Sequence, residues 1–179
     1  MNSPKRCESG FTLIEIIAVL LLLSIIAATV MGRAINTENI ELAAQMDKVR
    51  NHFRYAHSMA MKNGDAIWGF KASADKKYYW VFRLEPPVAD PIGEPDLPAN
   101  QVLLPGEENL KVDLDSKNVN LLAPAIYFDR FGRPYLYYVG ESDPSNIPFP
   151  NPQKLSIFTT TAPSIVREYW VLPETGLIR

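Results

Sequence analysis

The chain has 179 residues and a formal net charge of −2, enough for one membrane-spanning helix and one modest globular domain. This charge gives no overall attraction to nucleic acid or to anionic lipid. The single cysteine, Cys7, precedes the first apolar run, so the rest of the chain has no cysteine with which to form a disulfide.

Residues 11–31 form an apolar run that is long enough to cross a bilayer as a helix, since about 20 residues suffice. Glu15, one turn from the start, is the only charged residue in this run. A charged side chain held in hydrocarbon costs a few kcal/mol, about 2.5–3.5 at the helix centre and less near its end. An acid at this position therefore indicates a function and calls for a cationic partner.

A short basic stretch that ends in glycine, Lys5-Arg6-Cys7-Glu8-Ser9-Gly10, precedes the apolar run. Basic residues mark the cytoplasmic end of a spanning segment, so we expect the chain after residue 31 to lie outside. A secretory signal peptide has a shorter apolar core, of about 7–15 residues, and is cut after that core. The length of the run and Glu15 disfavour this interpretation, which leaves an ordinary signal anchor as the plain alternative.

The order Gly10, Phe11, Thr12, Leu13, Ile14, Glu15 closely resembles the class III leader of type IV prepilins and type II secretion pseudopilins. The resemblance implies that a prepilin peptidase recognises Lys5, Arg6 and Gly10 and cuts between Gly10 and Phe11. It also implies N-methylation of the new Phe11 amine. Glu15 of one subunit could then pair with the Phe11 amine of the next. Leaving one partner of a buried pair alone costs about 3–5 kcal/mol, so the pair would fix the axial register of assembly.

A second helical pattern follows and is amphipathic. Its apolar positions recur every three or four residues and predict one stripe on the core: Leu42, Met46, Val49, Phe53, Ala56 and Ala60. The polar residues off this stripe are expected to face water or neighbouring subunits: Glu41, Gln45, Lys48, Arg54 and His57. Lys62 in the last turn and Gly64 as a C-terminal cap predict a stop near Asn63. Gly32 and the polar residues 36–39 leave open whether the helix is continuous.

Short β-type runs follow Gly64. Residues 66–71 and 78–84 predict a hairpin, and further strands are expected at 119–122, 125–128, 135–139, 155–160 and 165–172. Two proline-rich loops are expected, 85–109 and 141–153, and the first is expected to be exposed and without strands. The stretch 129–134 predicts a tight turn with Gly132 at its special backbone position. The class is therefore α+β: a long N-terminal helix, membrane-spanning in its first half, packed on an antiparallel sheet as in pilins.

Three segments resemble the GspH/FimT group of pilin-like proteins: residues 54–64 at the helix end, residues 126–134, and residues 175–179. The resemblance implies a minor pseudopilin of a type II secretion system that assembles into a pseudopilus and helps drive protein export. Its expected parts are a cleaved leader (1–10), a transmembrane assembly half-helix (11–33), an amphipathic half-helix (34–64) and a periplasmic β-rich domain (65–179). It implies a single pass through the bacterial inner membrane, and as partners the major and minor pseudopilins, the prepilin peptidase and the inner-membrane assembly platform.

The alternative is a FimT-like type IV minor pilin, active in pilus biogenesis or DNA uptake. Some members of that group bind DNA through a basic Gly-Arg-x-Arg motif, and Gly176-Leu177-Ile178-Arg179 keeps only the last arginine. Phosphate binding needs several cations together, and Arg167 with Arg179 makes a poor patch. We therefore expect no nucleic-acid partner.

An enzyme is disfavoured as a third class. His52 and His57 are five residues apart, which puts them on different sides of a helix and excludes a helical metal pair. The chain has no Gly-x-Ser-x-Gly element and no Gly-rich phosphate loop. Asp113 and Asp115 are too weak a signal for a calcium loop. We expect no catalytic residue, no cofactor and no metal.

Overall fold

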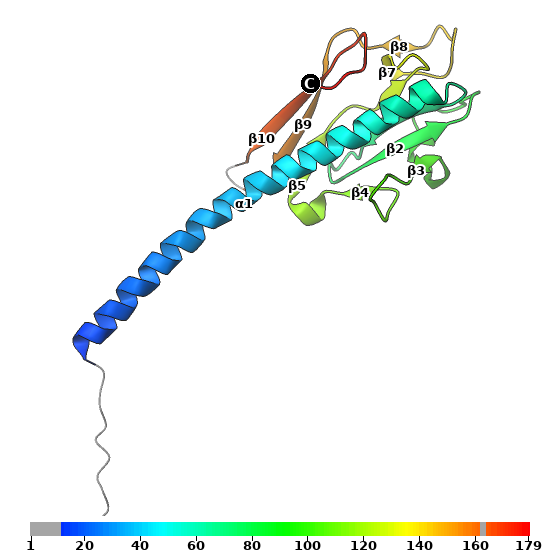
Figure 1. Cartoon of the computed structure of the whole chain (residues 1–179). Helices are drawn as coiled ribbons and strands as arrows, with labels where there is room; N and C mark the ends of the chain where they lie inside the picture. The colour runs from blue at the N-terminus through cyan, green and yellow to red at the C-terminus, as the bar shows by residue number, and fades with distance from the viewer. Residues whose placement is uncertain (1–11, 162–163) are drawn as a thin grey trace, which may run out of the picture. The chain divides into compact units, whose positions relative to one another are not determined.

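The computed structural model describes residues 12–161 and 164–179, and the side chains of these residues apart from 31–38. The chain forms two units, Met1–Asn39 and Ile40–Arg179, and helix α1 (Leu13–Lys62) contributes to both (Figure 1). Gly32 and residues 36–39, where the sequence left a break open, are helical.

In the first unit, α1 carries Glu15 in its first turn, where the backbone N–H of Glu15 donates to the carbonyl of Thr12 at 3.1 Å. The window Leu13–Val30 has a mean hydropathy of 2.8, and none of it is buried within the protein. The two hydroxyls in this window donate to carbonyls three residues earlier, Ser24 to Leu21 and Thr29 to Ile26. These bonds satisfy both hydroxyl groups within the helix itself, as a lipid environment would require.

In the second unit, the predicted apolar stripe of α1 packs on the sheets. All six of its members are buried: Leu42, Met46, Val49, Phe53, Ala56 and Ala60. The prediction for the polar side was wrong at Gln45, which is only 7% exposed and donates to Glu41 Oε1 at 2.9 Å. It was also wrong at His57, whose half-buried ring contacts other segments of the domain.

The helix ends at Lys62, close to the predicted stop, but Gly64 is not its left-handed cap. Gly64 is absent from the glycines of positive φ, which are Gly106, Gly132, Gly140 and Gly176. Two backbone hydrogen bonds hold the turn that follows α1 instead. The N–H of Asn63 donates to the carbonyl of Met59, and the N–H of Ala66 donates to the carbonyl of Asn63. Gly64 suits a close approach, because a Cβ there would lie 3.2 Å from Cβ of Arg130.

The larger sheet has the strand order β3-β2-β1-β6-β7-β8, with β4 also paired to β2, and all pairs are antiparallel. Its strands are β1 (Ile67–Ala72), β2 (Tyr78–Leu84), β3 (Gln101–Val102), β4 (Val112–Asp113), β6 (Ile126–Phe128), β7 (Pro134–Tyr137) and β8 (Ile147–Pro148). The predicted hairpin is confirmed, with Ile67 opposite Leu84 and Ala72 opposite Tyr79.

The smaller sheet has the order β10-β9-β5 and is also antiparallel, with strands β5 (Val119–Leu122), β9 (Gln153–Thr159) and β10 (Val166–Val171). The backbone N–H of Leu121 in β5 donates to the carbonyl of Lys76, in the turn between β1 and β2, at 2.9 Å. Residues of both sheets join the stripe of α1 in one core, which includes Phe70, Phe128 and Ile157. The structure confirms the predicted α+β, pilin-like class.

A second, smaller core lies away from this stripe and contains Trp80, Phe82, Leu84, Tyr127 and Val88. Residues 85–109, the proline-rich segment, bind to it: the indole N–H of Trp80 donates to the carbonyl of Pro95 at 2.7 Å. The hydroxyl of Tyr127 donates to the carbonyl of Pro91. The segment was expected to be exposed and free of strands. Most of its residues are exposed, but the expectation of no strand was wrong, because the segment supplies β3 as well as two 3-10 turns, Glu94–Asp96 and Pro98–Asn100. The second loop, 141–153, likewise contains β8.

Candidate functional site

The assembly residues expected from the sequence fall at the start of the chain. Lys5, Arg6, Gly10 and Phe11 lie outside the described residues. Glu15 is described: it is exposed, and it lies beside Ile16, Val19 and Leu20 on an apolar helix surface. Its carboxylate thus stands among hydrocarbon side chains, the setting in which a cationic partner would matter most.

His57 joins three segments that are far apart in the sequence. Its Nε2 lies 3.1 Å from the carbonyl oxygen of Gly132 and 2.9 Å from that of Thr175. Since carbonyl oxygens only accept, Nε2 carries a proton and donates it to both. The edge of the ring packs against Phe128, with centroids 5.3 Å apart. We call this contact of His57, Gly132 and Thr175 the His57 junction.

The turn that follows β6 is built on Asp129, which is 2% exposed. Its Oδ1 accepts from the backbone N–H of Phe131 at 2.9 Å and of Arg133 at 2.8 Å. Its Oδ2 accepts from Nε of Arg133 at 2.7 Å. This hydrogen bond raises the pKa of Arg133. Gly132 has φ +80, which confirms the predicted glycine turn.

The C-terminal residues fold back on β10. Val171 and Ile178 form a bridge, and the N–H and carbonyl of Arg179 both bond to Trp170. The turn between them contains Gly176 with φ +63. A Cβ on Gly176 would lie 2.5 Å from the carbonyl oxygen of Gly132, and one on Gly132 would lie 2.6 Å from Nε2 of His57. The two glycines therefore allow the segments to approach as closely as they do.

The His57 junction brings together the helix end, the 129–134 turn and the C-terminal turn. These belong to the three segments in which the sequence leads us to expect a resemblance to the GspH/FimT group. Sequence reasoning treated them as separate features and missed their contact. The sequence carried no signal for this contact: His57 directly follows Ala56 of the buried stripe, but Arg54 follows Phe53 in the same way and is exposed.

A second histidine is buried at another point of α1. Nδ1 of His52 lies 2.9 Å from the hydroxyl of Tyr79, and its Nε2 lies 3.8 Å from Oε1 of Glu107, which pairs with Lys48 at 2.6 Å. Burial lowers the pKa of His52, although the nearby carboxylate of Glu107 opposes this. Burial also raises the pKa of Tyr79. This cluster ties the proline-rich segment to the helix.

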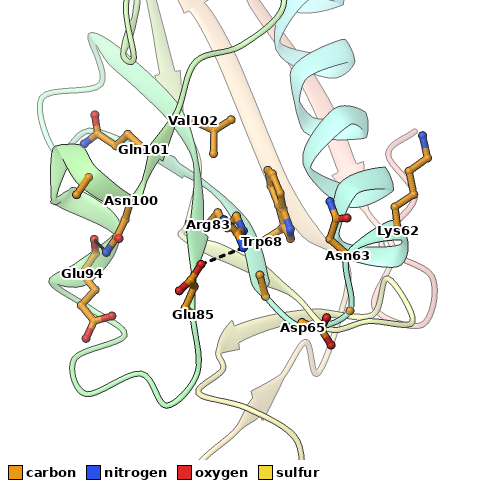
Figure 2. Close-up of a pocket in the computed structure, with 13 residues that line it drawn as sticks. Lys62, Asn63, Asp65, Trp68, Arg83, Glu85, Glu94, Asn100, Gln101 and Val102 are labelled. Atoms are coloured by element: carbon orange, nitrogen blue, oxygen red, sulfur yellow. Dashed lines mark hydrogen bonds and ion pairs between the residues drawn. The ribbon is translucent and has the colours of Figure 1, made fainter.

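A cleft of about 940 Å³ opens at the end of α1, where Lys62 and Asn63 border it (Figure 2). Trp68 and Val102 line it together with charged residues of both signs, among them Lys62, Asp65 and Glu94. Arg83 there is paired with Glu85 at 3.0 Å. Among residues 12–161 and 164–179, no group of three or more His, Cys, Asp or Glu is placed to hold a metal ion. The residues that line the cleft carry polar groups of both charges, but they do not include a nucleophile paired with a general base, which catalysis would need.

Comparison with known protein families finds a match for the N-terminal part of the chain. The model of the prokaryotic N-terminal methylation motif matches residues 5–31. The match supports a pilin or pseudopilin class. No curated protein and no solved structure matches the chain.

This class carries several consequences. Proteins with the motif are structural rather than enzymatic. The motif implies processing by a prepilin peptidase and assembly with other pilin-like proteins. The apolar helix Leu13–Val30 is consistent with membrane anchoring, by length and composition.

Proposed function

We propose that the chain is a minor pseudopilin of a type II secretion system. After cleavage between Gly10 and Phe11 and methylation of Phe11, its helix enters a periplasmic pseudopilus that helps to export folded proteins. The protein is held in the inner membrane until assembly, with residues 65–179 in the periplasm. Glu15 sets its register by pairing with the terminal amine of a neighbour.

One observation carries this choice within the class: the three GspH/FimT-like segments meet at the His57 junction. If the three segments resembled this group only by chance, we would not expect them to contact one another in the fold. Here a single imidazole, Gly132 and Gly176 make them one packed unit, so the resemblance falls on residues that depend on one another.

A deletion strain complemented with the full chain tests the proposal. We expect deletion to leave secreted proteins in the periplasm and the full chain to restore export. Mass spectrometry of the purified protein should find a methylated terminus at Phe11. A mature protein that still begins at Met1, or unchanged export after deletion, would contradict the proposal.

The same deletion strain distinguishes the proposed function from the alternative, that of a FimT-like minor pilin. Loss of surface pili or of DNA uptake, with export unchanged, would favour that function. Arg167 and Arg179 are both exposed, so salt-sensitive DNA binding that is lost in Arg179→Ala would point the same way.

A further inference from the structure

The turn that follows α1 contains the only Asn-Gly pair of the chain, Asn63-Gly64. Every other asparagine is followed by a residue that carries a side chain. The backbone nitrogen of the residue after an asparagine can attack the side-chain carbon Cγ, because this attack closes a five-membered ring. Glycine has no Cβ to obstruct the approach, and its backbone is the least restricted. An Asn-Gly pair is therefore reactive wherever a fold leaves it free.

The fold leaves this pair accessible. Asn63 and Gly64 are both exposed, and they follow Lys62, the last residue of α1. Both border the cleft at the end of the helix, and Figure 2 shows Asn63 among the residues that line it. Water and hydroxide thus have a path to the side-chain amide.

The hydrogen bonds of the turn do not hold the two reacting groups. Within the ranges 12–161 and 164–179, neither the side-chain amide of Asn63 nor the N–H of Gly64 has a hydrogen-bond partner. The turn is held through other atoms, since the carbonyl of Asn63 accepts from the N–H of Ala66. The amide of Asn146 is different: it accepts from the N–H of Val139 at 3.0 Å and donates to the carbonyl of Gly140 at 2.7 Å.

We propose that Asn63 is a modification site at which the chain reacts with itself, without an enzyme. The nitrogen of Gly64 forms a bond to Cγ of Asn63, the Cγ–Nδ2 bond breaks, and Nδ2 leaves as ammonia with the proton of the Gly64 N–H. Water then opens the ring. Opening at the former side-chain carbonyl gives an aspartate, and opening at the backbone carbonyl gives an isoaspartate. Either product changes the net charge from −2 to −3. The reaction needs no partner, so it does not depend on the proposed function.

Both products strain the turn. The new carboxylate lies at the C-terminal end of α1, where the helix dipole disfavours an acid, and it is two residues from Asp65. The isoaspartate also lengthens the backbone by one carbon. The turn has little room for this change, because a Cβ on Gly64 would already lie 3.2 Å from Cβ of Arg130. The modified domain is therefore less stable than the fresh one.

Mass spectrometry of the full-length protein, aged in detergent and in water enriched in heavy oxygen, tests the site. Heavy oxygen enters only where the amide becomes an acid during ageing. We expect it at Asn63 about tenfold or more faster than at Asn109, which is equally exposed but is followed by Leu110. The rate should rise at alkaline pH, because the attacking nitrogen must lose its proton. Equal rates at the two asparagines would overturn the proposal.

A synthetic peptide of residues 59–69 gives the rate without the fold. We expect the folded chain to convert at a similar rate, since neither reacting group is held. A folded chain that is slower than the peptide by about tenfold or more would show that the fold protects the site, and the proposal would be wrong.

Thermal unfolding tests the consequence. Asn63→Gln keeps an amide but needs a six-membered ring, so it should neither take up heavy oxygen at position 63 nor lose melting temperature on ageing. Asn146→Gln is the matched control and should age at Asn63 as the native protein does. An isoaspartyl carboxyl methyltransferase should label the aged native protein and not aged Asn63→Gln. Equal losses of melting temperature in these two aged proteins would overturn the effect assigned to the site.

Discussion

The imidazole of His52 and the hydroxyl of Tyr79 lie 2.9 Å apart in the interior of the domain, where Tyr79 is fully buried and His52 is 6% exposed. Glu107 approaches the other ring nitrogen to 3.8 Å and binds Lys48. One buried histidine therefore links α1, β2 and the proline-rich segment, and its protonation state affects all three.

Acidification should destabilise the domain through His52. Burial lowers the pKa of His52 in the folded state below its ordinary value of 6.5. The unfolded chain therefore binds more protons near and below this pH, so the stability is fully present above 6.5 and is lost as the pH falls through the folded pKa. Urea unfolding of the full chain in detergent between pH 7.5 and 5 measures it. His52→Gln should show a shallower loss than the native protein, and equal slopes would contradict the assignment.

Removal of the Asp129 carboxylate should unfold the turn beneath Phe131. Asp129→Ala leaves two backbone N–H groups and the Arg133 guanidinium without their acceptor, at a cost of about 2–4 kcal/mol in unfolding free energy. Asp113→Ala is the matched control, because Asp113 is exposed and accepts from the backbone N–H groups of Asp115 and Ser116 in its own turn. That control should lose about 0.5 kcal/mol or less. Equal losses in denaturant unfolding would show that burial of Asp129 is unimportant.

Gly176→Ala should be more harmful than Gly106→Ala, although both glycines have positive φ, +63 and +85. A left-handed alanine costs about 1–2 kcal/mol at either site. At Gly176 the Cβ would also lie 2.5 Å from the carbonyl of Gly132 and 3.0 Å from the His57 ring, whereas at Gly106 nothing lies within 4 Å. The difference between the two melting temperatures measures the steric part. No difference would mean that the His57 junction is loosely packed.

Replacement of Glu15 should block assembly without blocking membrane insertion. In Glu15→Leu the neighbour's terminal amine would lose its partner, a penalty of about 3–5 kcal/mol for a buried pair. We expect the variant in the membrane fraction but absent from filaments. Asp47→Leu, which removes an exposed acid from α1 beyond the apolar window, should assemble as the native protein does. Efficient incorporation of Glu15→Leu would rule out the charge pairing.

The elements with strong periodic patterns could be predicted from the sequence, and those fixed by tertiary contacts could not. The stripe from Leu42 to Ala60 and the hairpin at 67–84 follow from spacing alone, because each buries one face. Strands β3, β4 and β8 have two residues each, too few for an alternating pattern. They exist because longer neighbours present free backbone groups to them.

In the candidate site, too, the features with a local sequence pattern could be predicted, and those that depend on tertiary contacts could not. The leader motif is local, so the sequence could predict the methylation motif, which the family model matches at residues 5–31. The role of Glu15 stays a prediction. The His57 junction could not be predicted, since its hydrogen bonds join positions 75 and 118 residues apart. Gln45 was misjudged for a related reason: its side-chain N–H₂ group donates to Glu41 one turn earlier, which lowers the cost of burying this end of the side chain.

The indole N–H of Trp80 donates to the carbonyl of Pro95, and the hydroxyl of Tyr127 donates to the carbonyl of Pro91. Lys71 also pairs with Asp96 at 2.7 Å. A deletion within residues 85–109 that removes these prolines would expose the aromatic side chains of Trp80 and Tyr127 and leave their N–H and O–H groups without acceptors. The shortened protein would have an exposed aromatic surface that favours aggregation. A loss of solubility in such a deletion would therefore reflect lost packing on this surface, and would not show that residues 85–109 bind a partner.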